Sequence, residues 1–307
     1  MKKTKVLQIT DLPEQTTKAL TDKFDVVRLP KSAAELDQLI DSQGEAIEAI
    51  AGMGSGKVDA ELLSRLPNLK MISTYTAGQE GIDVAAAEAK GIAVANTSHI
   101  LAQEVADTTL WLLLTVAKNA LNADKYVREG KWQSGNFPLA RSIASMKIGI
   151  LGLGHIGQAV AQRLDIMGAE TGYFGRGRKS QFDYRYFSDL KEMATWCDVL
   201  VVACPGGAET YRIVNEEVIA AVGPQGYIVN IARGSVIDEE AMVEALKSGG
   251  LGGAGLDVFA DEPNVPQALI DSDRVALLPH IGSATLETRR RMGEAMITAL
   301  EKHFGAK

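Results

Sequence analysis

The sequence predicts an α/β protein built from two doubly wound domains, each containing a parallel β-sheet. Two observations support this prediction. Short apolar runs alternate with helical patterns in both halves of the chain, and this alternation is typical of parallel sheets with helices on both faces. In addition, a chain of 307 residues is too long for one ordinary domain.

The first hundred residues contain enough strands for one such domain. Ser32 and Asp59 stand at the start of helical patterns and are suited to cap them. The predicted strands cover residues 6–9, 26–29, 46–51, 71–73 and 92–94, and the predicted helices cover residues 14–24, 32–39 and 59–66.

A long apolar helix is predicted over residues 101–118, and its broad apolar surface suggests burial at a domain junction. Residues 119–145 show few periodic signals, so we predict an irregular segment that is either an interface arm or a surface excursion. The α/β alternation then resumes. The later strands are predicted at residues 171–174, 199–203, 227–231, 254–258 and 275–278, and the later helices at residues 189–195, 217–222, 239–248 and 285–304.

A glycine-rich run, K-I-G-I-L-G-L-G-H-I-G, joins an apolar strand directly to a helical pattern. Gly152 permits the tight turn, Gly154 allows the backbone to approach a pyrophosphate, and Gly157 allows the helix to pack closely on the strand. The helix N-terminus would offer unpaired N–H groups to the phosphates. Alone, the motif could be a tight turn only, but its place between strand and helix predicts a Rossmann dinucleotide site. The predicted contacts in this turn are Gly152, Leu153, Gly154, His155, Ile156 and Gly157.

The next strand predicts which dinucleotide binds. NAD sites place an acidic residue about twenty positions after the glycines, where it binds the ribose 2′-hydroxyl. Here Gly175 replaces the acid, and Arg176, Arg178 and Lys179 follow it. Guanidinium groups can bind a 2′-phosphate through charge-assisted hydrogen bonds. We therefore predict NADP, with NAD possible at lower preference; the alternative is a solvated basic loop.

Three polar clusters follow strands of the second domain, where α/β sheets place their ligands. His280 follows an apolar strand and could exchange a proton near neutral pH. Glu262 follows the preceding strand, so it could orient the imidazole and stabilise its protonated form. Arg233 could bind a substrate carboxylate through two hydrogen bonds. Each residue alone could be purely structural, but together they favour hydride transfer to a 2-oxo acid.

Composition limits the other classes of function. The net charge of −7 and the pI near 5.3 argue against non-specific binding to nucleic acid or anionic membranes. Cys197 and Cys204 lie in or beside apolar runs, and no metal-binding spacing of Cys and His is present. The most apolar stretch, residues 110–117, is shorter than the ~20 residues of a membrane span. The basic start of the chain leads into a strand instead of a signal peptide, so we expect a cytoplasmic protein.

The motifs G-L-G-H-I-G, N-I-A-R-G, G-L-D-V-F-A-D-E-P and L-P-H-I-G-S resemble those of the D-2-hydroxyacid dehydrogenases. The resemblance is closest to the NADPH-dependent glyoxylate/hydroxypyruvate and hydroxyphenylpyruvate reductases. It covers essentially the whole chain and is strongest over residues 149–283. It implies two Rossmann-like domains with the active site in the cleft between them. Residues 1–99 with 286–307 would bind substrate, and residues 100–285 would bind the dinucleotide.

The resemblance also implies individual roles. The arginine, glutamate and histidine of the family's catalytic set fall on Arg233, Glu262 and His280. The amides of Ala77 and Gly78 would meet the substrate carboxylate, with Met53 and Gly54 on the other side of the pocket. The remaining cofactor contacts would be Cys204, Pro205, Ile231, Ala232, Asp257 and Gly282, besides Arg233 and His280 themselves. Relatives form homodimers through the cofactor domain, a use that fits the segment over residues 119–145.

The sequence departs from the family pattern at two positions. Asp107 stands where most members have glutamate, and Ala77 replaces the commoner valine, which would enlarge the pocket slightly. Formate dehydrogenases resemble this fold but place glutamine opposite the histidine, so Glu262 argues against that activity.

The predicted function is NADPH-dependent reduction of a small 2-oxo acid, such as glyoxylate, hydroxypyruvate or an aryl pyruvate, to the D-2-hydroxy acid. One alternative is an NAD-linked dehydrogenase of the phosphoglycerate type, and the basic run after Gly175 argues against it. The other is a non-catalytic protein that senses nucleotides. Closure around residues near 99 and 285 would exclude water. Neither a metal, a nucleic acid nor a membrane is expected as a partner.

Overall fold

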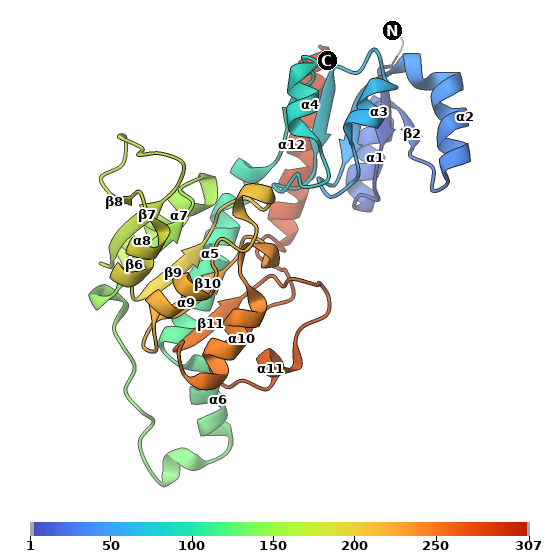
Figure 1. The fold of residues 1–307 in the computed structure, drawn as a ribbon. Helices are drawn as coiled ribbons and strands as arrows, with labels where there is room; N and C mark the ends of the chain where they lie inside the picture. Colours follow the sequence, from blue (N-terminus) through green and yellow to red (C-terminus); the bar gives the residue numbers. More distant parts are fainter. Residues whose placement is uncertain (1–2, 306–307) are drawn as a thin grey trace. The chain divides into compact units, whose positions relative to one another are not determined.

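The computed structural model describes residues 3–305, which fall into two compact units (Figure 1). The first unit contains the chain up to Leu101 together with the chain from Ala284 onwards, and the second contains Ala102–Ser283. Every strand pair in both sheets is parallel. The prediction of two parallel α/β domains is therefore confirmed.

The first unit contains a five-stranded sheet in the order β2-β1-β3-β4-β5. Its strands are β1 (Lys5–Gln8), β2 (Asp25–Arg28), β3 (Ile47–Gly52), β4 (Met71–Thr74) and β5 (Ala93–Ala95). Its helices are α1 (Glu14–Lys23), α2 (Ala33–Gln43), α3 (Ala60–Ser64), α4 (Val84–Ala89) and α12 (Leu286–Phe304), with a 3₁₀ turn η1 (Gly44–Ala46). Ser32 and Asp59 cap α2 and α3 as predicted, each accepting a backbone N–H three residues on.

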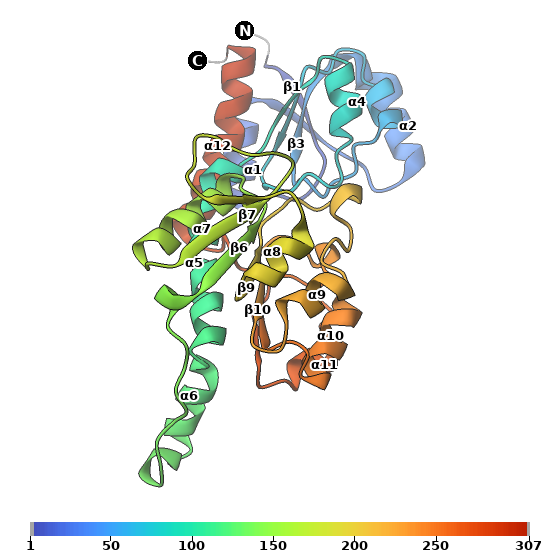
Figure 2. The same ribbon diagram turned by 60° about the vertical axis from the view of Figure 1, so that its left-hand side comes forward.

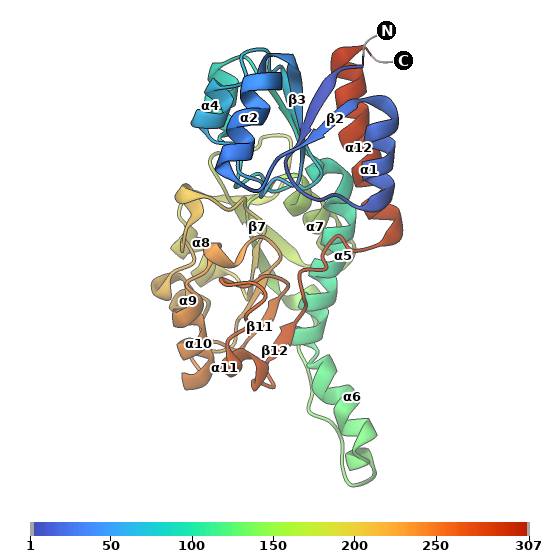
Figure 3. The ribbon, with the colours of Figure 1, turned by 90° about the vertical axis from the view of Figure 1, so that its right-hand side faces the viewer.

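The last helix, α12, completes this first unit and lies beside α1 (Figure 3). The hydroxyl of Ser73 in β4 donates to the carbonyl oxygen of Met296 at 2.9 Å, and the Tyr75 hydroxyl donates to that of Arg289 at 2.9 Å. Gly293 contacts α1 closely, because a Cβ there would lie 2.4 Å from Thr16 Oγ1. The core of the unit thus depends on residues from both ends of the chain.

The second unit contains a seven-stranded sheet in the order β12-β11-β10-β9-β6-β7-β8. Its strands are β6 (Lys147–Leu151), β7 (Glu170–Phe174), β8 (Arg185–Phe187), β9 (Val199–Val202), β10 (Tyr227–Asn230), β11 (Gly253–Leu256) and β12 (Val275–Leu277). The chain runs from β6 to one side through β7 and β8, then returns to β9 on the other side of β6. The strand order therefore reverses at β6, and such a switch point is where doubly wound sheets bind ligands.

Helices cover both faces of this sheet (Figure 2). The helices of this unit are α5 (Ser98–Ala117), which starts in the first unit, α6 (Ala120–Arg128), α7 (His155–Ile166), α8 (Leu190–Trp196), α9 (Glu216–Val222), α10 (Glu239–Ser248) and α11 (Gln267–Ile270). Short 3₁₀ turns are η2 (Lys131–Gln133), η3 (Ile143–Ser145), η4 (Ala208–Thr210) and η5 (Gly234–Val236). Ala254 and Leu256 of β11 pack in the same core cluster as residues of α8, α9 and α10. Gly255 between them faces α5, where a Cβ would lie 3.0 Å from Leu112 Cβ.

Helix α5 is long and apolar enough, by length and composition alone, to cross a membrane. It begins at Ser98, three residues before the predicted start. The helix is therefore longer than the apolar stretch over residues 110–117 that was compared with a membrane span. Half of its 18-residue apolar window is buried inside the protein, and a core helix passes the same test. Its packing against Gly255 is that of a core helix.

The prediction of an irregular segment over residues 119–145 is wrong for its first part. Residues Ala120–Arg128 form helix α6, and η2 and η3 follow. None of the α6 residues is buried, so the helix has no contact with the core of the unit. Ion pairs four residues apart, such as that between Asp124 and Arg128 at 2.7 Å, support it instead. The short elements α4, β8 and α11 also lacked clear periodicity and were not predicted.

Candidate active site

The turn between β6 and α7 has the geometry that a dinucleotide requires. Gly152 has a φ of +98°, and a Cβ there would lie 2.8 Å from the backbone of Cys204. A Cβ on Gly157 would lie 2.1 Å from the Gly152 carbonyl oxygen, so glycine allows α7 to pack closely on this turn. Gly154, the N-cap of α7, differs: a Cβ there would meet no protein atom within 4 Å. This open approach to the helix N-terminus fits a pyrophosphate.

Two tyrosines hold the loop that follows β7. The Tyr173 hydroxyl accepts the backbone N–H of Lys179 at 2.7 Å, and the Tyr186 hydroxyl donates to the carbonyl oxygen of Gly175 at 3.4 Å. The two rings pack together with their centroids 5.4 Å apart. The loop is therefore fixed at both of its ends.

The cationic side chains of this loop face solvent. Arg176 and Arg178 are exposed, and their guanidinium groups form no ion pair or hydrogen bond with the described residues 3–305. A Cβ at Gly175 would meet no atom within 4 Å, so the fold does not require glycine there. The arrangement fits a 2′-phosphate better than a 2′-hydroxyl.

The loop after β10 is fixed by its own polar groups. The Asn230 side chain accepts the Ala232 N–H and donates to the Arg233 carbonyl oxygen, each at 3.0 Å. The Arg233 guanidinium donates to the Ala232 carbonyl oxygen at 2.6 Å. A Cβ on Gly234 would lie 1.9 Å from the carbonyl carbon of Phe259. The loop that carries Arg233 therefore lies directly against the loop that carries Glu262.

Glu262 and His280 come together at the ends of the neighbouring strands β11 and β12. Glu262 Oε2 lies 2.7 Å from Nδ1 of His280, and both side chains are partly exposed. The other carboxylate oxygen, Oε1, accepts the backbone N–H of Phe259 at 3.1 Å. The carboxylate is thus held by its own loop and in turn orients the imidazole.

A second carboxylate fixes the backbone around His280. Asp257, only 2% exposed, accepts the N–H of Ile281 at 2.7 Å and that of Gly282 at 2.8 Å. His280 has a φ of +55°, which is uncommon for a residue with a side chain. Burial raises the pKa of Asp257, although its two amide hydrogen bonds oppose that shift. Asp257 therefore anchors a turn whose backbone is strained at the histidine.

The other residues of the predicted cofactor set lie along the same edge of the sheet. Leu153 lies in the glycine turn, His155 and Ile156 in the first turn of α7, Cys204 and Pro205 after β9, and Ile231 and Ala232 after β10.

The predicted substrate residues of the first unit also meet one another. Residues 53–54 directly follow β3. Residues 77–78 lie in the turn that follows β4, which ends at Thr74. The two turns are in backbone contact, because a Cβ on Gly54 would lie 1.8 Å from the Gly78 carbonyl oxygen. The N–H of Met53 donates to the Thr10 hydroxyl at 2.7 Å, so this amide is already satisfied within the unit.

A model of the NAD-binding domain of the D-isomer specific 2-hydroxyacid dehydrogenases matches residues 110–282. The chain belongs to this family. It is 41% identical over 302 residues to the hydroxyphenylpyruvate reductase of Plectranthus scutellarioides, covering 98% of this chain and 96% of that protein. It is 38% identical, with the same coverage, to a glyoxylate/hydroxypyruvate reductase of Arabidopsis thaliana.

Solved structures of 2-hydroxyacid dehydrogenases agree with this classification. The enzyme from Ketogulonicigenium vulgare Y25 matches with a TM-score of 0.87 and 37% identity, covering 99% of this chain and 96% of that one. The NADPH-dependent glyoxylate/hydroxypyruvate reductase of Sinorhizobium meliloti, in complex with NADP and malonate, matches with a TM-score of 0.86 and 36% identity, covering 98% of this chain and 94% of that one. The resemblance to the D-2-hydroxyacid dehydrogenases is confirmed, and with it oxidoreductase chemistry on a CH–OH group.

The two thiols of this dehydrogenase are not suited to nucleophilic catalysis. Both are free and buried, and burial raises the pKa of Cys197 to about 12 and that of Cys204 to about 11. Within residues 3–305, no group of three or more His, Cys, Asp or Glu side chains could hold a metal ion.

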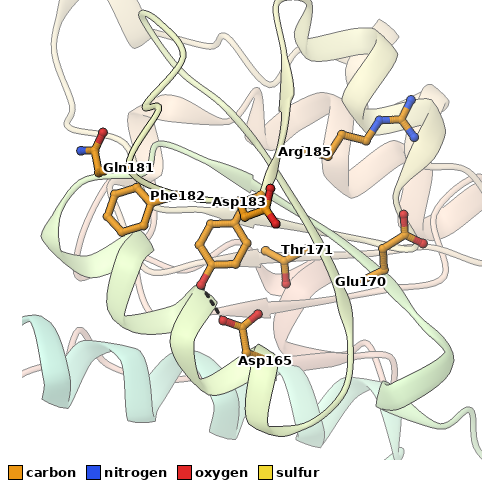
Figure 4. A pocket seen from close by; sticks show the side chains of 8 residues that line it. Asp165, Glu170, Thr171, Gln181, Phe182, Asp183 and Arg185 are labelled. Carbon is orange, nitrogen blue, oxygen red and sulfur yellow. Dashed lines mark hydrogen bonds between the residues drawn. The ribbon is translucent and has the colours of Figure 1, made fainter.

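The dehydrogenase also has a cavity of about 570 Å³ at the opposite, amino-terminal edge of β7 (Figure 4). It lies between the end of α7 and the segment before β8, and the Tyr184 hydroxyl donates to Asp165 across it at 2.6 Å. Burial raises the pKa of Tyr184 to about 12. Because parallel sheets bind ligands at their carboxyl edge, this cavity is not part of the active site.

Two features of the dehydrogenase site were missed by the sequence reasoning. The family resemblance placed Asp257 among the cofactor contacts, but nothing in the sequence indicated that it holds the Ile281 and Gly282 amides. The roles of Tyr173 and Tyr186 in fixing the basic loop were also missed. Tyr173 and Tyr186 lie opposite each other in the adjacent strands β7 and β8. This pairing is a signal that could have suggested their role in fixing the loop.

Proposed function

We propose that this dehydrogenase reduces a small 2-oxo acid to the D-2-hydroxy acid, with NADPH as its preferred cofactor. The observation that carries the proposal is the 2.7 Å contact between Glu262 and His280, in the same unit as a dinucleotide turn. The solved relative that is NADPH-dependent and was crystallised with NADP and malonate supports the choice of cofactor and of an acid substrate.

His280 would supply the proton of the reaction. Its Nδ1 is engaged by Glu262, so Nε2 is the nitrogen that can donate to the substrate carbonyl oxygen. The Glu262 carboxylate fixes the orientation of the imidazole ring and is itself held by the Phe259 amide. NADPH, when bound, supplies the hydride that adds to the carbonyl carbon. The product is a neutral alcohol group, because the carbon gains the hydride and the oxygen gains the proton.

The substrate carboxylate would be bound by Arg233 and by the amides of Ala77 and Gly78. A guanidinium binds carboxylate oxygens in a planar, directional way, which fixes the face of the carbonyl presented to hydride. In this proposal, residues 1–99 with 286–307 bind substrate and residues 100–285 bind the dinucleotide. Gly154, Arg176 and Arg178 would contact the pyrophosphate and the 2′-phosphate.

We also infer a homodimer that pairs through the cofactor domain, with α5 and the segment over residues 119–145 at the interface. Exposed apolar side chains occur along both, namely Trp111, Leu121, Trp132 and Leu139, and large exposed apolar patches mark interfaces. The two free thiols suit a reducing compartment such as the cytoplasm.

A steady-state panel of glyoxylate, hydroxypyruvate and an aryl pyruvate, each with NADPH and with NADH, tests the proposal. We expect turnover with NADPH to exceed turnover with NADH. His280→Asn should lower kcat by about 10²-fold or more while leaving the Kd for NADPH unchanged. Near-normal turnover in that variant would refute the role of His280. Tight NADPH binding by the parent protein without turnover of any 2-oxo acid would instead indicate a non-catalytic, nucleotide-sensing protein.

A further inference from the structure

We propose that the Thr76 hydroxyl is a positioning group that holds the turn at residues 77–78 in the shape that binds the substrate carboxylate. The inference rests on the proposed function, because it takes these amides as the carboxylate site. Thr76 itself would not touch the substrate in this proposal.

The turn has unpaired donors at the required place. Within residues 3–305, the N–H groups of Ala77 and Gly78 donate to no acceptor, and both residues are partly exposed. The two ends of this turn are tied to the loop after β3, since the N–H of Tyr75 donates to the Gly52 carbonyl oxygen at 2.8 Å and that of Gly81 to the Gly54 carbonyl oxygen at 2.9 Å. A successive pair of backbone N–H groups without a protein acceptor is suited to bind an anion.

The Thr76 hydroxyl connects the two substrate turns. It accepts the N–H of Gly54 at 2.9 Å and donates to the Gly78 carbonyl oxygen at 3.0 Å. Gly78 has no side chain and therefore wide conformational freedom. The hydrogen bond to its carbonyl limits rotation of the residue whose amide is left unpaired.

The backbone of Thr76 is anchored separately from its hydroxyl. Its carbonyl oxygen accepts the Thr74 hydroxyl at 3.1 Å and the Thr97 N–H at 3.4 Å. Loss of the hydroxyl would therefore leave residue 76 in place. It would release Gly54 and Gly78, the two groups that the hydroxyl joins.

The test compares three substitutions that separate the hydroxyl from side-chain volume. Thr76→Val keeps the shape but removes both hydrogen bonds, and Thr76→Ser keeps the hydroxyl. Thr171→Val is the matched control, because Thr171 is buried in β7 and its hydroxyl has no hydrogen-bond partner within the described chain. The measurements are kcat and KM for the best 2-oxo acid, the Kd for NADPH, and the Kd for oxalate with NADP present.

We expect Thr76→Val to raise both the KM and the oxalate Kd about tenfold or more, with the NADPH Kd unchanged. Thr76→Ser should stay within about threefold of the parent protein, and Thr171→Val within about twofold. Equal values for Thr76→Val and Thr76→Ser would overturn the proposal. If Thr76→Val does not fold, the pair Thr76→Ala and Thr76→Ser, which differs by one oxygen, decides the question by the same criterion.

Failure of the proposed function gives a different result. In that case the parent protein itself would turn over no 2-oxo acid, and oxalate would not bind to its complex with NADP. A normal parent protein together with an unaffected Thr76→Val variant would reject only the role of Thr76.

Discussion

Gly175 is the residue at which the cofactor preference can be tested most directly. Its missing Cβ faces open space, so Gly175→Asp introduces the acid of an NAD site without a clash. The carboxylate would repel a 2′-phosphate and could bind a 2′-hydroxyl. We expect the Kd for NADPH to rise about tenfold or more and the ratio of NADH to NADPH turnover to increase.

Gly177→Asp is the control for this substitution, because a Cβ at Gly177 also meets no atom within 4 Å. It adds the same charge two residues further along the loop. An equal effect of both variants would mean that the loop acts only through its overall charge. No change in either variant would contradict the predicted 2′-phosphate contact.

Single residues were predicted best where a strand ends. His280 and Glu262 could be paired from the sequence, because each follows an apolar strand and adjacent parallel strands end at one edge. The anchoring of Ile281 and Gly282 by Asp257 could not be predicted, since it depends on the path of the turn after His280. The Thr76 hydrogen bonds depend in the same way on the contact between two turns that are far apart in the sequence.

At the scale of elements, two glycines of the β6–α7 connection have different roles: Gly154 affects cofactor binding and Gly157 affects the stability of the fold. Gly154→Ala should leave the free energy of unfolding within about 0.5 kcal/mol of the parent value, because its Cβ meets no protein atom. The added methyl would obstruct the approach of the pyrophosphate, so the Kd for NADPH should rise.

Gly157→Ala, in contrast, should lower the free energy of unfolding. Its Cβ would overlap the Gly152 carbonyl oxygen at 2.1 Å, so α7 would have to move away from the strand. We expect a loss of about 1–3 kcal/mol in denaturant unfolding. A stable Gly157→Ala variant with normal NADPH affinity would show that this packing is not tight.

Elements with a strong apolar pattern were predicted within a few residues. The bounds predicted for α10 are those observed, Glu239–Ser248, and most strands differ by one or two residues. Helix α6, which buries no side chain, was not predicted, and neither was β8, a three-residue edge strand. Ion pairs four residues apart support α6, and pairing with β7 supports β8.

At the scale of the whole molecule, the two buried thiols report on the intact fold. With pKa values near 12 and 11, Cys197 and Cys204 stay protonated at pH 8, so neither should react quickly with a thiol reagent. Both should react once the protein is unfolded. Because both pKa values are raised in the folded protein, the contribution of the protonated thiols to the free energy of unfolding is fully present below about pH 9. That contribution is lost as the pH rises through 11 to 12. Rapid reaction of one thiol in the native protein would contradict its burial.

The proposed dimer is tested by the mass of the protein in solution. Trp132 is 63% exposed and Leu139 fully exposed, so replacing both with aspartate should cost the folded unit little. We expect light scattering to give the mass of a dimer for the parent protein and of a monomer for this double variant. A parent protein that is monomeric at micromolar concentration would rule out the proposed interface.

The position of α12 in the first unit affects the order in which the two units can fold during synthesis. The five-stranded unit begins with β1, but Met292, Met296 and Leu300 of its core arrive only with the final helix. The second unit is contiguous in sequence and can complete its core earlier on the ribosome. The first unit to be translated is therefore the last to be finished, and a nascent chain that stalls before α12 would carry one complete nucleotide-binding unit and an amino-terminal sheet that lacks the cover of α12.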